Sequence, residues 1–322
     1  MNKKIKSLYR RVGSKNIFLI EGVAMEGIHD GFVFSDFQKQ KTFTISAELH
    51  SIINSEDVLN LSFIAPKQTN WESTLREDYE FGFTIIKNEI EHKKINKAIL
   101  SRKKVKNQRV NVNKLFLELC DNYQASHIFL TETPNGELWI GATPETLLEK
   151  KDVGYQTMSL AGTKESIDID WTQKEFAEQR IVTNAIVGEL FKFNINPDIE
   201  DLETVKAGAV FHLRNKINFE TNESAITIAN ALHPTPAISG NPKKQAISTI
   251  KIAENHEREY YCGFGGIVRN GQVENLFVNL RCASVSSNQI CLYIGGGITK
   301  DSELTKEWEE CDRKADSLLR LL

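Results

Sequence analysis

Short strand-like segments follow one another in runs along this chain, and long amphipathic helical segments separate the runs. Turn residues, such as the Pro134-Asn135-Gly136 sequence, join the strand-like segments within each run. Runs of strands joined in this way favour mainly antiparallel sheets. The pattern therefore predicts an α+β fold with the helices packed on the outside of the sheets.

The predicted elements cover most of the chain. Strands are expected at 16–21, 31–34, 41–45, 59–64, 97–105, 126–132, 137–149, 154–160 and 216–220, with three more between 262 and 298. Helices are expected at 70–96, 110–124, 171–193, 223–232, 243–258 and 302–322. No flexible linker, internal repeat or low-complexity tract separates these elements, so we expect residues 1–322 to form a single domain.

Composition argues against several classes of protein. The formal net charge is −3 and no long basic run occurs, so neither nucleic acid nor a membrane surface is expected as a partner. No apolar run approaches the ~20 residues that a transmembrane helix needs. The 5 cysteines are dispersed without a Cys-x-x-Cys pair, which indicates reduced core residues of a cytoplasmic protein. The sequence implies no obligate protein partner.

Two predicted helices carry acidic pairs beside their apolar faces. Glu175 and Glu178 belong to the helix at 171–193, and Glu307 and Glu310 belong to the last helix. Residues three apart are neighbours on a helix surface, so each pair places two carboxylates side by side. Carboxylates beside an apolar face need a cation or a proton to compensate them. Oxygen ligands without His or Cys point to Mg²⁺, although two acidic surface helices would show the same spacing.

Lys97 and Glu145 are isolated charges in strand-like segments. Lys97 shares one face of its strand with Ile99 and Ser101, where a lysine is suited to act as a base. It would equally suit an edge strand, where lysine prevents edge-to-edge aggregation. Glu145 follows Pro144 inside a strand-like run, and the residue alone is as readily an exposed strand residue.

Other polar residues and glycines are candidates for ligand binding. Arg281 interrupts an otherwise apolar strand segment, and such an arginine usually pairs with a carboxylate of the protein or of a substrate. His212 and His233 are isolated and are interpreted as structural histidines. Glycines that let the backbone approach a ligand occur at 160–163, 238–240 and 295–297. None of them lies in a phosphate-binding motif, so nucleotide binding is disfavoured.

Taken together, these segments resemble the chorismate-binding enzymes, and among them most closely the isochorismate synthases. The matching segments follow the order of the family and fall within residues 95–320. They are 97–102 (KAILSR), 142–148 (ATPETLL), 159–163 (SLAGT), 174–178 (KEFAE), 232–240 (LHPTPAISG), 261–263 (YCG), 280–283 (LRCA), 295–298 (GGGI) and 307–310 (EWEE). Each segment is a weak signal alone, and their joint order carries the resemblance.

The resemblance implies a fold and a metal site. Family members share a large α/β sandwich of antiparallel sheets, with one Mg²⁺ beneath the substrate carboxylate in a cleft. By position, Glu178 and Glu310 resemble the direct metal ligands. Glu175 and Glu307 resemble the outer pair that reaches the ion through water.

The resemblance also implies catalytic and substrate-binding residues. Lys97 resembles the base that activates water, for which it must be uncharged, and Glu145 resembles the acid that protonates the departing hydroxyl of chorismate. Family members that use ammonia typically carry glutamine in place of this lysine, so Lys97 points to water as the nucleophile. Positions that match substrate-lining ones are Gly162, Thr163, His212, Thr235, Tyr261, Arg281, the glycine turn of Gly295, Gly296 and Gly297, and Lys314.

The sequence leaves three functions open. We expect an Mg²⁺-dependent isochorismate synthase that serves menaquinone or catecholate siderophore synthesis. A salicylate synthase, which shares the lysine and goes on to eliminate pyruvate, is the enzymatic alternative, and a non-catalytic chorismate-binding relative is the third. The N-terminal part, residues 1–90, is shorter than is usual in the family, and Gln179 stands where many relatives have histidine.

Overall fold

The computed structural model describes residues 4–63, 67–207 and 210–322, apart from the side chains of 47–49. Its strands pair antiparallel and form one continuous sheet. The strands are β1 Lys4–Arg10, β2 Ile17–Glu26, β3 Gly31–Ser35, β4 Phe43–Ile53, β5 Lys97–Lys106, β6 His127–Glu132, β7 Leu138–Thr143, β8 Thr146–Lys150, β9 Tyr155–Lys164, β10 Asp198–Ile199, β11 Glu203–Ala207, β12 Val210–Phe219, β13 Gly240–Asn241, β14 Phe264–Arg269, β15 Gln272–Val278, β16 Cys282–Val285 and β17 Ile290–Ile298.

The sheet consists of two halves that the N-terminal strands join. One half has the order β13-β5-β17-β16-β7-β6, and the other has the order β14-β15-β8-β9-β12, followed by β11 and β10. The connection runs through β1, which pairs with β6, and β3, which pairs with β14, with β2 and β4 between them. Because the sheet is continuous, we propose that the described residues form one domain.

Aromatic side chains fill the space between the two halves. Phe129 of β6 stacks on Phe277 of β15 with ring centroids 5.3 Å apart, and Phe34 of β3 contacts Phe129 at 5.5 Å. All three rings are buried. Contacts of this kind between large rings bury much apolar surface, so they hold the two halves together as the layers of a sandwich.

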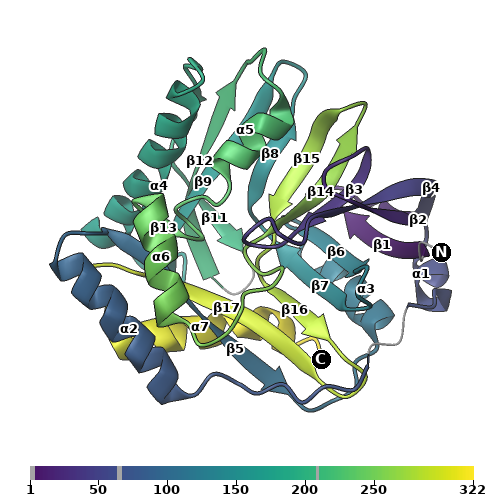
Figure 1. Ribbon diagram of the computed structural model, residues 1–322, viewed down its shortest axis with the longest axis horizontal. Helices are drawn as coiled ribbons and strands as arrows, with labels where there is room; N and C mark the ends of the chain where they lie inside the picture. The colour runs from purple at the N-terminus through teal and green to yellow at the C-terminus, as the bar shows by residue number, and fades with distance from the viewer. Residues whose placement is uncertain (1–3, 64–66, 208–209) are drawn as a thin grey trace.

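Helices cover the outside of these layers (Figure 1). They are α1 Ser55–Asn60, α2 Arg76–Glu91, α3 Val112–Asn122, α4 Gln173–Phe191, α5 Ala225–Leu232, α6 Lys243–Ala253 and α7 Leu304–Leu319. In Figure 1, α2, α4 and α6 lie along one side of the strands, and β1–β4 lie at the opposite side. α4 packs against β9 and β12, while α7 packs against β17, so the two glutamate-bearing helices lie at opposite ends of the sheet order. Within the part of the chain that the structure describes, no helix is both long and apolar enough to cross a membrane.

Trp308 fixes α7 against β5. The Arg102 guanidinium covers the indole ring at 3.5 Å from its centroid, and Tyr79 of α2 contacts the ring at 5.2 Å. One turn later, Asp312 pairs with Arg102 at 2.9 Å and with Lys104 at 2.6 Å. Cation–π and ion-pair contacts on one face of α7 therefore set its rotation and leave its glutamates on a neighbouring face.

The strand predicted at 59–64 is wrong. Residues 59 and 60 end α1, residues 61–63 have no regular structure, and Ile64 lies outside the described residues. Asn54 and Asp57 form a capping box at the start of α1, in which each side chain accepts a hydrogen bond from the backbone of the other. This local hydrogen bonding favours a helix over the strand that the apolar residues suggested.

Other predicted boundaries also differ from the structure. The predicted strand at 137–149 is two strands, β7 and β8, and the region 262–298 holds four strands rather than three. The helix predicted at 243–258 ends at Ala253, and the helix predicted at 70–96 is confined to α2. Strands β1, β10, β11 and β13 were not predicted, because each is short or carries charges that obscure the alternation.

Alanine at two helical glycines should have opposite effects on stability. A Cβ at Gly82 of α2 would lie 2.4 Å from the Ala253 carbonyl oxygen, whereas one at Gly188 of α4 would meet nothing within 4 Å. Gly82→Ala should lower the free energy of unfolding by about 1–3 kcal/mol through overpacking. Gly188→Ala should leave it unchanged or raise it by up to about 1 kcal/mol, because alanine favours the helix. Denaturant unfolding measures both, and equal effects would contradict the close contact of α2 with α6.

Candidate active site

A cavity lies where the two ends of the sheet approach each other. Residues of β5 and β17 line it from one half, residues of β9 and β12 line it from the other, and α4 and α7 complete the wall. Its empty space is about 1020 Å³, including the part that opens to solvent. Apolar residues such as Ile99 and Leu280 lie among charged ones in its lining. A concave site of this composition suits a small polar ligand.

Lys97 begins β5 and lies in the cavity wall with 3% of its surface exposed. β17 pairs with β5 beside it, with Gly297 opposite Ile99. A Cβ at Gly297 would lie 2.7 Å from Lys97 Cε, and a Cβ at Gly295 would lie 2.8 Å from the Tyr261 hydroxyl. The absence of side chains at these positions therefore makes room for the lysine and the tyrosine. The predicted glycine turn at 295–297 is wrong, because these residues belong to β17.

Glu145 lies between β7 and β8 and is 2% exposed. Burial raises the pKa of its carboxyl to about 8, although a hydrogen bond from the Thr235 hydroxyl at 3.3 Å and the charge of Lys97 act in the opposite direction. A carboxyl with this pKa carries a proton at neutral pH. Glu145 is therefore a buried carboxyl that holds a proton at neutral pH rather than an exposed strand residue.

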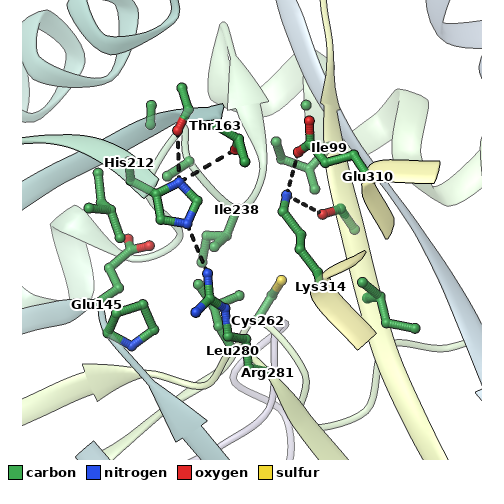
Figure 2. Close-up of a pocket in the computed structure, with 18 of the residues that line it drawn as sticks. Ile99, Glu145, Thr163, His212, Ile238, Cys262, Leu280, Arg281, Glu310 and Lys314 are labelled. Carbon is green, nitrogen blue, oxygen red and sulfur yellow. Dashed lines mark hydrogen bonds and ion pairs between the residues drawn. The ribbon is translucent and has the colours of Figure 1, made fainter. Parts of the chain in front are cut away.

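His212 of β12 connects two walls of the cavity (Figure 2). Its Nδ1–H donates to the Gly162 carbonyl oxygen at 2.7 Å, and its Nε2 accepts from the Arg281 guanidinium at 2.9 Å. The Thr163 hydroxyl lies 3.4 Å from Nδ1. Burial, together with the charges of Arg281 and Lys314, lowers the pKa of His212 to about 3. A neutral ring protonated on Nδ1 satisfies both strong contacts, so His212 holds Arg281 in place.

Arg281 lines the cavity without a carboxylate partner among the described residues. The prediction that Arg281 lies inside one apolar strand is wrong, because it lies between β15 and β16. Its φ is 48°, and Cys262, which also lines the cavity, has φ 61°. Such left-handed conformations are unusual for residues with side chains and concentrate at functional sites. A half-buried guanidinium that contacts no carboxylate of the described residues is suited to bind an anionic ligand.

Lysines neutralise the glutamates of α7. Glu310 accepts a hydrogen bond from Lys314 at 2.7 Å (Figure 2), and Glu307 pairs with Lys174 of α4 at 3.3 Å. The Ser302 hydroxyl donates to Glu307 at 2.7 Å. Burial alone would raise the pKa of Glu310, but Lys314 outweighs it and lowers the pKa to about 2. Burial and the charge of Glu310 raise the pKa of Glu307.

The glutamates of α4 have different partners. Glu178 lies 3.9 Å from Lys174 and 4.0 Å from Lys97, while burial raises its pKa against the effect of both lysines. Glu175 accepts from the Thr172 N–H at 2.9 Å in the capping box at the start of α4. One glutamate of α4 thus faces two lysines, and the other is tied to the beginning of its own helix.

The chemistry of these residues fits a magnesium ion. Four carboxylates line one cavity, and their burial and mutual repulsion would be relieved by a hard dication with oxygen ligands. In the observed side-chain conformations, no three acidic, His or Cys side chains of the described residues converge as ligands of a metal ion. Lysines and Thr172 hold the carboxylates apart, so binding of the ion requires them to leave these partners.

The cavity brings together the predicted site residues, except Thr235 and Gly296. Thr235 lies behind Glu145, to which it donates. Gly296 faces α7, where an added Cβ would lie 3.2 Å from a carboxylate oxygen of Glu307. Lys174 also lines the cavity and was not predicted as a site residue. Its position one helical turn before Glu178 is a sequence signal, but ordinary surface helices show the same spacing.

Comparison with known families places the chain in a class. The sequence model described as chorismate binding enzyme matches residues 34–322. This match covers most of the chain, and the protein belongs to the chorismate-binding enzyme family.

The curated relatives are named isochorismate synthases. EntC of Escherichia coli strain K12 is 29% identical over 210 residues, which cover 61% of this chain and 54% of the relative. MenF of the same strain is 32% identical over 198 residues, which cover 57% and 45%. DhbC of Bacillus subtilis is 24% identical over 269 residues, which cover 76% and 68%. The chain spans about half the length of several curated relatives that it matches.

Solved structures share the fold. The menaquinone-specific isochorismate synthase MenF of Escherichia coli aligns with a TM-score of 0.85 at 19% identity, over 100% of this chain and 89% of the other. A putative 2,3-dihydroxybenzoate-specific isochorismate synthase of Bacillus anthracis gives 0.83 at 22% identity, over 98% and 96%. Anthranilate synthase component I of Streptococcus pneumoniae gives 0.67 at 18% identity, over 94% and 72%. These similarities confirm the predicted α+β sandwich.

Glu145→Gln tests the protonation of the buried carboxyl through stability. The pKa of Glu145 is about 8 in the folded protein, whereas that of an ordinary, exposed glutamate is 4.5, so the folded state binds more protons between these pH values. Stability contributed by this proton is therefore lost as pH rises through that window. Glutamine keeps the size and does not titrate. The difference in unfolding free energy, variant minus wild type, should therefore increase with pH by on the order of a few kcal/mol between these two pKa values. Above the higher pKa the difference should stay constant.

Denaturant unfolding at a series of pH values measures this difference. Glu80→Gln, at an exposed position of α2, is the matched control and should show no such trend. A stability difference that does not change with pH would mean that Glu145 is already ionised in the folded protein at low pH.

Proposed function

We propose that this protein is an isochorismate synthase that converts chorismate to isochorismate in the cytoplasm. The observation that carries the proposal is the position of Lys97 and Glu145 in the walls of one cavity, which also holds the Arg281 guanidinium and the four carboxylates of Glu175, Glu178, Glu307 and Glu310. The names of the relatives support the same reaction. The described cysteines are buried thiols, as expected in a reducing compartment.

The reaction exchanges a ring hydroxyl for one derived from water. The attacking water loses a proton, and the departing hydroxyl gains one. Lys97, in the uncharged amine form that this role requires, accepts the first proton and becomes an ammonium, and Glu145, which is protonated at neutral pH, supplies the second and becomes a carboxylate. General base and general acid each contribute about 10²–10⁴-fold to rate when they are held in place. Both residues are buried in the cavity wall, which excludes competing water from them.

Positive side chains orient the substrate, because chorismate carries two carboxylates. Arg281 offers a planar guanidinium for bidentate contact with one carboxylate, and His212 fixes its orientation. Lys314 offers a second cation once it leaves Glu310. Fixed contacts at the carboxylates hold the ring against the base and the acid, and such positioning supplies much of the rate enhancement in enzymes.

Mg²⁺ bound by Glu178 and Glu310, with Glu175 and Glu307 contacting it through water, would supply positive charge for a substrate carboxylate. The protein groups around these ligands compete with the ion. Lys174 contacts both Glu178 and Glu307, and it must move when they turn toward the metal. Metal binding at these glutamates would therefore replace their contacts with lysine.

Chromatography of a reaction with chorismate and Mg²⁺ tests the proposed activity. We expect isochorismate above the no-enzyme control. Lys97→Ala should lower turnover by about 10²–10⁴-fold because the base is lost, while chorismate still binds. Lys94→Ala, at an exposed lysine near the same strand, is the matched control and should keep wild-type turnover.

Each other product identifies a different function. Salicylate with pyruvate would indicate a salicylate synthase, and binding of chorismate without conversion would indicate a non-catalytic relative. Near-normal turnover of the Lys97→Ala variant would mean that another group is the base.

Glu310→Gln tests the metal site. Loss of one carboxylate should raise the dissociation constant of Mg²⁺ by at least about tenfold in a calorimetric titration. Glu309→Gln changes the adjacent, exposed glutamate of α7 and should leave the titration as in wild type. An unchanged titration for Glu310→Gln would remove this residue from the set of ligands.

A further inference from the structure

A buried ion pair lies behind the strand that begins with Lys97. The side chains of Arg258 and Glu254 are 3% and 2% exposed. Arg258 makes two parallel contacts with the carboxylate, through Nη2 at 2.7 Å and through Nε at 2.9 Å. Burial alone would raise the pKa of Glu254, but the adjacent guanidinium outweighs it, and the pKa is lowered. Neither residue lines the active-site cavity.

This pair completes the hydrogen bonding of β5. The short strand β13 pairs with β5 over only two residues, beginning at Lys97. Beyond them, Arg258 Nη2 donates to the Ile99 carbonyl oxygen at 2.7 Å, and Glu254 accepts from the Ser101 N–H at 2.7 Å. The two side chains thus replace a neighbouring strand along the edge of β5, directly after the proposed base.

Arg258 also holds the turn that contacts Glu145. Its Nη1 donates to the Ile238 carbonyl oxygen at 2.8 Å. Within this turn, the N–H groups of Ile238 and Ser239 donate to the Thr235 carbonyl oxygen at 3.1 and 3.0 Å. The Thr235 hydroxyl donates to Glu145 at 3.3 Å. One guanidinium therefore links the strand of the proposed base to the turn that contacts the proposed acid.

We propose that the Glu254–Arg258 pair is a positioning device that fixes Lys97 and Glu145 relative to each other. The inference rests on the proposed function, in which these two residues are the base and the acid. The guanidinium is planar and its contacts with the carboxylate are bidentate, so the pair has one preferred geometry. Its stack against Phe37, at 4.6 Å from the ring centroid, restricts that geometry further.

A role in stability alone would not require charges here. Replacing both members of a buried ion pair with neutral residues of similar volume is often neutral or stabilising, whereas removing one member leaves an unpaired charge. The double variant Glu254→Gln/Arg258→Met therefore separates the two roles. It removes both charges and keeps much of the volume, but methionine cannot donate to the carbonyl groups of Ile99 and Ile238.

The experiment compares wild type with Arg258→Met, the double variant and Arg258→Lys. The measurements are Tm, kcat and KM for chorismate in the presence of Mg²⁺. Arg258→Met should lower Tm, and the double variant should recover most of that loss. We expect kcat of the double variant to stay about 10²-fold below wild type, with KM changed by less than about threefold, since a displacement of about 1 Å costs about this factor. Arg258→Lys keeps the charge but loses the fork, and its kcat should fall by at least about tenfold.

Backbone hydrogen exchange gives a readout that does not need catalysis. In Arg258→Lys, the amides of 98–101 and 235–239 should exchange faster together by at least about tenfold, while those of β9 stay as in wild type. Lys192→Met/Glu189→Gln, which removes an ion pair at the end of α4, is the matched control and should change neither segment nor kcat.

Two outcomes would overturn the proposal. One is a double variant with recovered Tm and kcat within about threefold of wild type, and the other is Arg258→Lys with wild-type kcat and exchange. If the double variant does not fold, Arg258→Lys decides alone. If wild type makes no isochorismate, the proposed function fails, while the joint change in exchange still decides whether the pair couples the two segments.

Discussion

The pairing of β5 with β17 is the contact on which the rest of the site depends. It places a strand without side chains at Gly295 and Gly297 beside the strand that begins with Lys97. A long cationic side chain can then lie inside the protein without a clash, and the Tyr261 hydroxyl approaches the same strand. Because β17 continues toward α7, the same pairing also brings the acidic helix over the cavity. Backbone geometry thus decides where the charges lie.

Charge balance is the second constraint on this cavity. Three lysines and five glutamates line it, together with a guanidinium that has no carboxylate partner in the described chain. Unpaired charges are costly in such surroundings, which is why Lys314 contacts Glu310 and Lys174 contacts Glu307. An anionic ligand and a dication would form a second balanced set from the same residues. Exchange between these two charge-balanced sets of contacts follows from the charges of the lining residues. It needs only the side chains to move, not the backbone.

The sequence predicted the class of fold and most of the residues around the cavity, but not their geometry. The motifs around Lys97, Glu145 and Arg281 could be recognised because their order in the chain matches a family. The environments of these residues could not be predicted, because the burial of Glu145 depends on Thr235, which is ninety residues away in the chain. The three glycines at 295–297 follow an apolar run, and this pattern predicts a turn. Close contacts with Lys97 and Tyr261 instead require glycine at positions inside a strand. Lys174 was missed because a lysine among helix charges has no distinctive pattern until its partner helix is known.

The connection between the two halves of the sheet runs through strands that do not touch the cavity. β1 and β3 attach to β6 and β14, and β7, β16 and β17 separate β6 from β5, the strand that carries Lys97. A small rotation at this connection would cause a larger displacement at the far ends of the sheet, because displacement grows with distance from the axis of rotation. Substitutions in the first fifty residues could therefore change the width of the gap between the two walls without changing any residue that contacts the ligand.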